Sequence, residues 1–508
     1  MARELELKFA LAPEDAAGFR AAPALAGITP SRARMLALYF DTPRRELARA
    51  GMALRLRRRG GRWVQTLKAG HSGTGGLHVR SEWEFKRGGP SVDLSLFADT
   101  PLAALDDAPR LHERLGEVFR VESLRTTWKI DASPGMHLET VLDQGRVAAK
   151  GRFDAICEVE IESLAGDRGA VFDLASRLLE TVALRPSGVT KAERGYRLAA
   201  GRRLEPAKAT EIRLDAKLMP LAAARAVIAA GLEQLQANEE GLLATPEPEF
   251  VHQARVALRR MRSALRMFRD AIGVERAEGW RSALGELGVA LGAARDWDVL
   301  ATETLPPVLK AFGDVKIQRR LIARAARRRR RERDAARAAV RSRQYAGVVL
   351  DLARWLALEE AAAAAAPAES LDDFASRLIR KRHKRLVQDA ARLQALSVAE
   401  RHQVRIDTKR LRYGVDAMAS IFPAKRVERY LDVLVALQDA LGRANDAATG
   451  SRLVAELDPP EPFAAFARGW FAAHASGDPL VFNVLLEKLA DTPRFWRRAR
   501  GKANPTEA

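Results

Sequence analysis

Cysteine is almost absent from this chain of 508 residues, in which Cys157 stands alone. A single cysteine excludes a disulfide within the chain, so the fold cannot depend on one. Long apolar runs are missing too, since nowhere do about 18 uncharged apolar residues follow one another, as a membrane-spanning helix requires. The start of the chain, MARELELKFA, carries charges where a secretory signal would have its apolar core. We therefore expect a cytoplasmic protein that does not enter membranes.

Aromatic residues make up only 6% of the sequence, and no strand-like segment is rich in them. Proteins that bind single-stranded nucleic acid stack bases on aromatic side chains, so we expect nucleic acid to be at most a nonspecific partner. The eight histidines and the one cysteine do not gather at the spacings of zinc ligands. The composition therefore argues against a zinc site.

Positive charge is what the chain has in excess. Its 85 lysines and arginines exceed its 65 acidic residues, which gives a net charge of +20. Residues 1–200 hold 31 basic and 26 acidic side chains, whereas residues 201–508 hold 54 and 39, so the second part carries most of the excess. The length and the 47% of apolar residues are sufficient for two or three domains with cores of their own. We expect two functional regions and an acidic partner.

The first part of the sequence alternates with a period of two, the pattern of β-strands. The segments are 4–8, 54–57, 80–86 and 157–162, and the glycines between them favour antiparallel hairpins. In an ordinary half-buried strand the charged residues face water, but here charges of both signs share one face in several strands. A closed barrel with a charged interior accommodates this pattern. We predict an α+β protein that begins with an antiparallel β-barrel.

After residue 200 the pattern becomes helical, and the sequence repeats itself. The segment from His252 to Arg262 recurs 150 positions later from His402 to Arg412. We therefore predict an all-α bundle with two related halves. The expected boundaries are 1–200 for the barrel, 201–213 for a linker and 214–500 for the bundle, with halves at about 214–358 and 371–500.

The strand faces carry the residues of a metal-dependent polyanion site. Alternate residues on a strand share a face, so Glu4, Glu6 and Lys8 project together, and so do the acids of segment 158–162. Burying such charges singly is prohibitively costly, whereas carboxylates on a hard divalent cation and cations on phosphate oxygens can share one cavity. Because oxygen ligands abound, we expect Mg²⁺, with Mn²⁺ as the alternative.

At these residues the chain resembles the CYTH family, the triphosphate tunnel metalloenzymes. The matching motifs are Glu4-x-Glu6-x-Lys8, 39–43 (YFDTP), 54–57 (LRLR), 66–68 (TLK), Arg125, 143–145 (DQG), 158–162 (EVEIE) and 191–196 (KAERGY). The resemblance covers residues 1–200 and implies an eight-stranded antiparallel barrel whose tunnel binds a triphosphate. It places phosphate oxygens on Lys8, Arg55, Arg57, Lys68, Arg125 and Lys191, and the metal on Glu4, Glu6, Asp143, Glu158 and Glu160.

The chemistry that the resemblance implies is phosphoryl transfer to water. A basic cradle and a divalent cation suffice for it without a covalent nucleophile. We expect a metal-positioned water to attack a terminal phosphorus, with Glu4, Glu6 and Lys8 as the catalytic residues. Glu82, Glu84 and Glu162 lie on tunnel faces without an assigned role, and which acid accepts the proton stays open.

Two helical stripes of cations form the second candidate site. The first contains His252, Arg255, Arg259, Arg262 and Arg266, and the second contains His402, Arg405, Lys409 and Arg412, with Asp416 in the place of Arg266. A single stripe of this kind is usually a solvated face, but two copies at one offset favour facing stripes that line a channel for an extended polyanion. The arginines of 327–331 point all around a helix, for which a solvated face is as good an explanation.

The stripes resemble the CHAD domain, a helical module with two related halves that binds inorganic polyphosphate, over residues 214–500. In the second half, Asn445 and Ala448 depart from their counterparts Arg295 and Asp298. The resemblance implies polyphosphate binding by both stripes, in which the histidines either contact phosphate or order neighbouring helices.

Together the two resemblances imply an inorganic triphosphatase that releases pyrophosphate and phosphate, binds polyphosphate and localises at polyphosphate granules. Two alternatives stay open. One is a polyphosphate-binding protein without catalysis, and the other is a thiamine triphosphatase or a class IV adenylate cyclase built on the same barrel. The sequence does not determine the oligomeric state.

Overall fold

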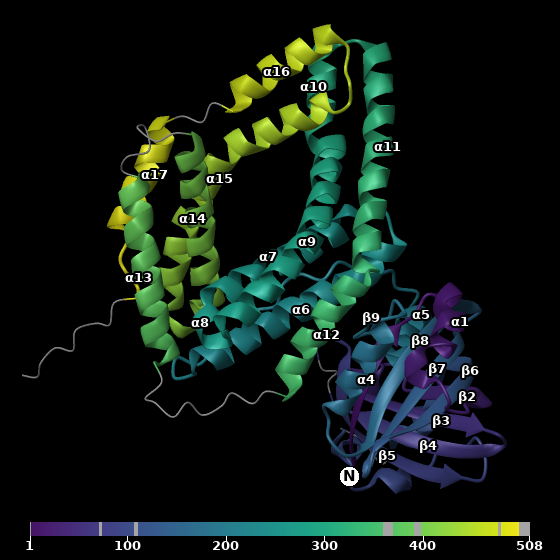
Figure 1. Cartoon of the computed structure of the whole chain (residues 1–508). Coiled ribbons are helices and arrows are strands. Elements are labelled where there is room, and N and C mark those ends of the chain that lie inside the picture. Colours follow the sequence, from purple (N-terminus) through teal and green to yellow (C-terminus); the bar gives the residue numbers. More distant parts are fainter. Residues whose placement is uncertain are drawn as a thin grey trace, which may run out of the picture. The chain divides into compact units, whose positions relative to one another are not determined.

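The computed structural model describes residues 2–70, 74–105, 110–358, 369–390, 398–475 and 479–496. The chain forms two compact units, which we call the barrel unit and the helical unit (Figure 1). The barrel unit contains Met1–Ala207, Leu232–Pro246 and Ala338–Glu360, and the helical unit contains Lys208–Gly231, Glu247–Arg337 and Ala361–Ala508. Within the described ranges, no helix is both long and apolar enough to span a membrane.

The barrel unit is built on one antiparallel sheet. Its strands are β1 (Ala2–Ala10), β2 (Ser31–Asp41), β3 (Met52–Arg59), β4 (Arg62–Ala69), β5 (Leu77–Arg87), β6 (Gly116–Ser133), β7 (Met136–Ala149), β8 (Arg152–Ala165) and the two-residue β9 (Arg185–Pro186). The order is β5-β4-β3-β2-β6-β7-β8-β1, with β9 beside β1, and an additional pairing of β5 with β1 closes the sheet. The prediction of an eight-stranded antiparallel barrel is confirmed.

Cross-strand register arranges the charged positions of the strands in rows. Glu162 of β8 lies opposite both Glu6 of β1 and Glu139 of β7. Two residues along β8, Glu160 lies opposite Lys8 of β1. Since side chains on neighbouring strands at the same register share a face, these charges project together into the barrel.

The apolar residues of the same strands face the other way. Leu5, Leu7 and Phe9 of β1 are buried in a core cluster with residues of α4 (Ala170–Leu179). The barrel therefore has a charged interior and an apolar exterior that helices cover. This arrangement explains why charges of both signs share one strand face.

Short helices surround and close the barrel. They are α1 (Ala16–Arg20), α2 (Glu46–Arg49), α3 (Leu111–Arg114), α4, α5 (Lys191–Ala200) and the 3-10 turns Pro13–Asp15, Pro23–Leu25, Leu94–Phe97 and Pro101–Ala104. Helix α5 begins with a capping box, in which Thr190 accepts from the backbone N–H of Glu193 and the Glu193 carboxylate accepts from that of Thr190. Such a box stabilises the first turn and fixes where Lys191 stands.

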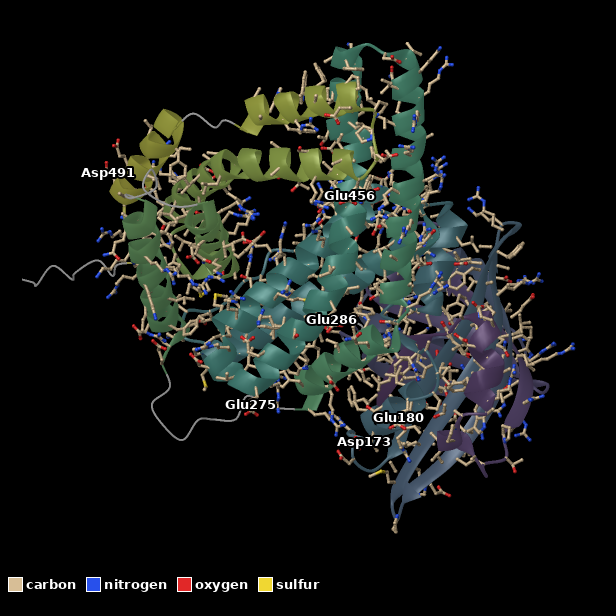
Figure 2. All side chains as sticks on the ribbon, turned by 45° about the horizontal axis from the view of Figure 1, so that its top comes forward. Asp173, Glu180, Glu275, Glu286, Glu456 and Asp491 are labelled. Atoms are coloured by element: carbon tan, nitrogen blue, oxygen red, sulfur yellow. The ribbon has the colours of Figure 1, made fainter. Side chains whose placement is uncertain are left out.

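Two later segments of the chain complete the barrel unit. They contain the second half of α6 (Pro220–Ala244) and the whole of α12 (Arg343–Leu358). Ala346, Leu350 and Ala353 of α12 join the core cluster of α4 and β1. Arg354 also donates to Asp173 at 2.5 Å, and Figure 2 labels Asp173 on α4. Buried apolar contacts thus tie α12 to the barrel.

The rest of the described chain is helical, as predicted. The elements are α7 (Pro248–Met267), α8 (Arg269–Ile272), α9 (Val274–Val299), a π-helical turn (Leu300–Thr304), α10 (Leu305–Phe312), α11 (Val315–Val340), α13 (Leu371–Ala390), α14 (Val398–Ala417), a 3-10 turn (Ala419–Ile421), α15 (Ala424–Ala455), α16 (Glu461–Ala475) and α17 (Pro479–Asp491). In each half, the helix that carries the stripe packs on the long helix after it, α7 on α9 and α14 on α15.

Candidate active site and cation stripes

A cavity of about 370 Å³ lies inside the barrel and is lined by charged side chains of both signs. Its basic residues are Lys8, Arg55, Arg57, Arg59, Lys68, Arg80, Arg125 and Lys191, and its acidic residues are Glu6, Glu82, Glu84, Glu139, Asp143, Glu160 and Glu162. All six residues expected to hold phosphate oxygens are among them. Of the expected metal ligands, Glu6, Asp143 and Glu160 line this cavity, and the side chain of Glu4 lies outside the described residues.

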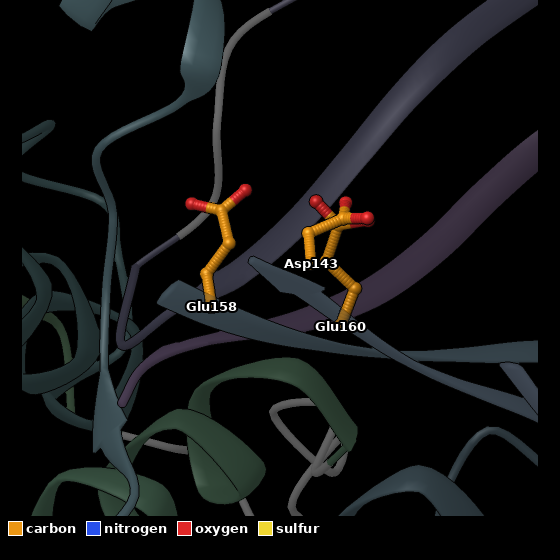
Figure 3. A group of neighbouring side chains, drawn as sticks. All are labelled: Asp143, Glu158 and Glu160. Carbon is orange, nitrogen blue, oxygen red and sulfur yellow. The ribbon is translucent and has the colours of Figure 1, made fainter. Parts of the chain in front are cut away.

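Three carboxylates lie close together beside the cavity; Asp143 and Glu160 line it, whereas Glu158, an expected metal ligand, is not part of its lining. Oxygens of Asp143, Glu158 and Glu160 all lie within 4.8 Å of one another. The three side chains rise from β7 and β8 on the same side of the strands (Figure 3). Close-set carboxylate oxygens are the ligands that Mg²⁺ and Mn²⁺ prefer, so these residues fit a hard divalent cation.

Lysine and arginine side chains contact all three carboxylates and hold Asp143 and Glu160 in the ionised state. The ammonium of Lys191 lies 2.8 Å from an oxygen of Asp143, and Arg125 donates to Asp143 at 2.6 Å and 2.9 Å. Burial alone would raise the pKa of Asp143, but Lys191 and Arg125 outweigh it and lower that pKa to about 2. Lys8 binds the third acid, Glu158, at 3.0 Å. Despite burial, Lys191, Arg125 and Lys8 also hold the pKa of Glu160 well below its ordinary value, so Asp143 and Glu160 are ionised at neutral pH.

The opposite side of the cavity is rich in arginine. Arg55 donates to Glu82 at 3.2 Å, and Arg57 donates to Glu84 at 3.1 Å. The nearby positive charge of Arg55, together with burial, lowers the pKa of Arg57 to about 10. A lowered arginine pKa means that Arg57 lies in a field of positive charge. An anion placed between these arginines would be stabilised by that field.

Three charged residues of the cavity, Arg59, Arg80 and Glu139, were not predicted. Glu139 lies four residues before Asp143 on β7, so period-two alternation could have found it. Arg80 continues the alternation of Glu82 and Glu84 on β5. Its guanidinium donates to Nδ1 of the buried His78 at 3.3 Å.

Glu162 is a cavity acid with an unusually high affinity for a proton. Burial and the negative charge of Glu6 across the strand raise its pKa to about 7. This carboxyl can therefore take up or release a proton near neutral pH.

In the helical unit, the two cation stripes come together at Tyr413. The guanidinium of Arg259 on α7 lies 5.7 Å from the centre of the Tyr413 ring, and that of Arg412 on α14 lies 4.6 Å from it. Burial and the positive charges of Arg405 and Arg259 lower the pKa of Lys409 to about 8. These residues of both stripes share one electropositive region.

Other stripe residues have neighbours within the protein. Arg255 donates to Asp296 at 2.9 Å and to the carbonyl of Gly292 at 3.1 Å. Burial and the positive charge of Arg295 lower the pKa of His252, so this histidine is neutral at pH 7. The remaining residues are Arg262 and Arg266 on α7, Arg405 on α14, and His402, whose side chain lies outside the described residues.

The arginine-rich helix α11 is not simply a solvated face. Arg329 and Arg333 both bind Asp298 of α9, at 2.6 Å and 2.8 Å, and Asp298 is fully buried. Arg328 lies 3.5 Å from Glu456, the residue that follows α15 and that Figure 2 labels. Part of the arginine run 327–331 therefore stabilises the packing of the helices, while Arg330 and Arg331 are exposed.

The barrel is closed, and acids and arginines line its interior. Paired cation stripes follow on helices. Together these features define a protein with a barrel domain and a helical domain. The chain belongs to the CYTH and CHAD domain families: residues 2–196 match the CYTH domain, and residues 226–455 match the CHAD domain.

Two relatives illustrate the likeness. An inorganic triphosphatase of Haemophilus influenzae is 29% identical over 204 residues, which are 39% of this chain and 56% of that protein. The chain thus spans little more than half the length of this relative. The crystal structure of the CHAD domain from the plant Ricinus communis is 32% identical and aligns with a TM-score of 0.50, covering 57% of this chain and 98% of that domain.

Proposed function

We propose that the barrel hydrolyses inorganic triphosphate to pyrophosphate and phosphate with the help of Mg²⁺ or Mn²⁺. The observation that carries this proposal is one cavity whose lining combines Asp143 and Glu160, two of three close-set carboxylates, with a group of arginines. A triphosphate is a compact anion with oxygens along its whole length, so it can contact both sides at once. The inorganic triphosphatase among the relatives agrees with this substrate.

The chain's own residues bind and orient the substrate. Arg55, Arg57 and Lys68 would hold the phosphate oxygens on the arginine-rich side, and Lys8, Arg125 and Lys191 would hold them beside the carboxylates. These contacts fix the phosphorus chain and neutralise its oxygens, which is most of what phosphoryl transfer requires. Because these lysines and arginines already lie in the cavity before the substrate binds, the site needs little reorganisation during the reaction.

We assign the carboxylates to two groups with different roles. Asp143, Glu158 and Glu160 would hold the cation, with Glu4 and Glu6 as ligands of a second one. When bound, the cation supplies neutralisation of phosphate oxygens and a water of lowered pKa. Glu162, whose pKa of about 7 leaves a large ionised fraction at neutral pH, would be the cavity acid available to take up a proton.

The helical unit binds inorganic polyphosphate in our proposal, and would bring the enzyme to polyphosphate granules. The support is that Arg259, Arg412 and Lys409 lie in one region, where their like charges repel one another. An extended polyanion relieves this repulsion along its length. The similarity of this chain to the plant CHAD domain is consistent with a helical module of this kind.

The test is phosphate release from triphosphate, ATP and thiamine triphosphate with Mg²⁺ or Mn²⁺. We expect triphosphate to be the preferred substrate. If the purified chain leaves triphosphate intact, the proposal of a triphosphatase is wrong and a purely binding protein replaces it. Preference for ATP or thiamine triphosphate would instead support a cyclase or a thiamine triphosphatase.

Paired variants separate the two activities. Glu4→Gln with Glu6→Gln should abolish turnover and spare polyphosphate binding. Arg255→Ala with Arg405→Ala should weaken polyphosphate binding and spare turnover. Loss of both activities in either pair would contradict the assignment of one activity to each unit.

A further inference from the structure

One amide side chain of the barrel unit bridges the two backbone segments on either side of Lys8. The Oε1 atom of Gln236, near the end of α6, accepts a hydrogen bond from the backbone N–H of Gly75 at 2.9 Å. Its Nε2 atom donates to the carbonyl of Pro186 at 3.2 Å. Gln236 is buried, so both bonds are protected from water.

These two segments make the hydrogen bonds that hold the backbone of Lys8. The carbonyl of Gly76 accepts from the N–H of Lys8 at 2.8 Å, and the N–H of Ser187 donates to the carbonyl of Lys8 at 2.8 Å. Each partner of Gln236 is therefore the chain neighbour of a partner of Lys8. If Gln236 moved, its partners Gly75 and Pro186 would move with it, and their chain neighbours Gly76 and Ser187 would displace the backbone of Lys8.

The packing at Gly75 and Gly76 leaves no room for adjustment. Both have positive φ, and a Cβ on Gly75 would lie 2.4 Å from the Cβ of Ala353, whereas one on Gly76 would lie 2.7 Å from the carbonyl oxygen of Lys8. Because only glycine allows such close approach, the position of this segment is fixed by contacts on both faces.

The segment after Pro186 leads directly to the second lysine of the site. Ser187 accepts a hydrogen bond from Nε2 of the buried His78 at 3.2 Å, and three residues later Thr190 caps the helix that begins with Lys191. Before Pro186, Arg185 binds the buried carboxylate of Glu239, one turn of α6 beyond Gln236, at 2.5 Å. The end of α6 thus anchors the stretch between β9 and Lys191.

A buried amide needs partners in any protein, so two hydrogen bonds alone would indicate only a structural role. What distinguishes Gln236 is that its two partners belong to segments 111 residues apart that meet at one catalytic lysine. We propose that Gln236 is a positioning residue, which sets the place of the Lys8 ammonium in the cavity by clamping the Gly75–Gly76 and Pro186–Ser187 segments together. This inference rests on the proposed function of the barrel.

The first test compares two buried glutamines in the full chain. Gln236→Met keeps the volume and removes both bonds, and Gln253→Met removes a bond of Gln253 to Glu249 within α7. We expect Gln236→Met to lower kcat for triphosphate by between about tenfold and a hundredfold at temperatures where it is folded, with a smaller change in KM, because displaced catalytic groups lose rate steeply. If kcat falls equally in both variants, or in neither, the inference is overturned.

The second test asks whether Gln236 acts through Lys8. Triphosphate affinity is measured by calorimetry in EDTA for the wild type, Gln236→Met, Lys8→Met and the double variant. We expect Gln236→Met to weaken binding in the wild type and to change little in Lys8→Met, since two residues that act as a unit are not additive. Additive losses would overturn the positioning role. If Gln236→Met does not fold, Gln236→Asn, whose shorter amide cannot reach both partners, takes its place.

Different results would contradict the proposed triphosphatase activity and the proposed role of Gln236. A wild-type chain that binds triphosphate but does not hydrolyse it contradicts the triphosphatase, while the binding cycle still decides the role of Gln236. A wild-type chain that hydrolyses triphosphate while the cycle is additive contradicts the role of Gln236 alone. A wild-type chain that does not bind triphosphate overturns both.

Discussion

The ammonium nitrogen of Lys191 lies 2.8 Å from Oε1 of Glu160. Lys191 also contacts Asp143 and Glu158, so one cation at the start of α5 holds the carboxylate group of the cavity together. These acids are buried, and their mutual repulsion is offset by Lys8, Arg125 and Lys191. Removing one cation from such a group leaves buried charge without compensation.

Lys191→Met should therefore destabilise the barrel unit by about 3–5 kcal/mol at pH 7 and lower triphosphate turnover by at least about a hundredfold. The stability effect should depend on pH. Lys191 helps to hold the pKa of Asp143 at about 2, below its ordinary 3.8, and this contribution is present above pH 3.8 and lost as the pH falls toward 2.

Denaturant unfolding at pH 7 and pH 3 measures this effect. The difference between wild type and variant should shrink at pH 3. Lys129→Met, at an exposed position on β6, is the matched control and should change little at either pH. A Lys191→Met penalty that is equal at both pH values would contradict the electrostatic explanation.

Mg²⁺ should stabilise the wild-type chain against unfolding. A cation that binds only the folded state contributes about 2.7 kcal/mol when present at a hundred times its dissociation constant. Asp143→Asn with Glu160→Gln should lose this stabilisation, because two of the three clustered carboxylates are gone. Melting curves with Mg²⁺ and with EDTA make the comparison.

The control for the metal experiment is Glu122→Gln, which alters an exposed acid that binds Arg146 at 2.8 Å. It should keep the full response to Mg²⁺. Persistence of the response in the double variant would place the cation elsewhere in the protein.

Polyphosphate binding by the helical unit should weaken as the pH rises from 7 to 9. Lys409 has a pKa of about 8, so it is mostly charged at pH 7 and mostly neutral at pH 9. A bound polyanion favours the charged form and causes proton uptake near pH 8. We expect affinity at pH 9 to be about tenfold lower than at pH 7, the effect of one charged hydrogen bond.

Calorimetry in two buffers of different ionisation enthalpy reports both affinity and proton uptake. Lys409→Met should flatten the pH dependence, whereas Lys425→Met, at an exposed position on α15, should retain it. An unchanged slope in Lys409→Met would remove Lys409 from the binding site.

Asp298 should be important for stability and not for ligand binding. It is fully buried and bound by Arg329 and Arg333. Asp298→Ala should therefore cost about 3–5 kcal/mol, because it removes the buried carboxylate that both guanidinium groups bind. Arg331→Ala, at an exposed position in the same run, should cost less than about 0.5 kcal/mol. Equal effects in denaturant unfolding would contradict this division of the arginine run.

The alternation of segments 4–8, 54–57, 80–86 and 157–162 predicted a closed antiparallel barrel, because charges of both signs shared one face in several strands, and the resemblance to the CYTH family implied its eight strands. The helical part followed equally from its period and its repeat. What the sequence could not indicate is that α12 packs on the barrel. An amphipathic helix shows which face it buries but not against which partner, and Ala346, Leu350 and Ala353 would suit any apolar surface.

The candidate site was predictable where a motif fixed the strand parity. Lys8, Arg55 and Lys191 line one cavity as expected, although their roles stay predictions. Arg80 and Glu139 were missed because neither belongs to a motif, even though both continue an alternation. Gln236 carries no signal in the sequence, since its partners are backbone groups brought together only by the fold.

The composition of the barrel unit has a consequence for biosynthesis. The continuous stretch that contains all the strands ends at Ala207, but the unit takes its last residues from Ala338–Glu360. A ribosome adds roughly 5–20 residues per second, so about 8–30 s pass between synthesis of the last strand region and synthesis of α12. During that interval the nascent barrel exposes the apolar surface that Leu350 and Ala353 later cover. We therefore expect this apolar surface to be accessible to chaperones until α12 has been synthesised.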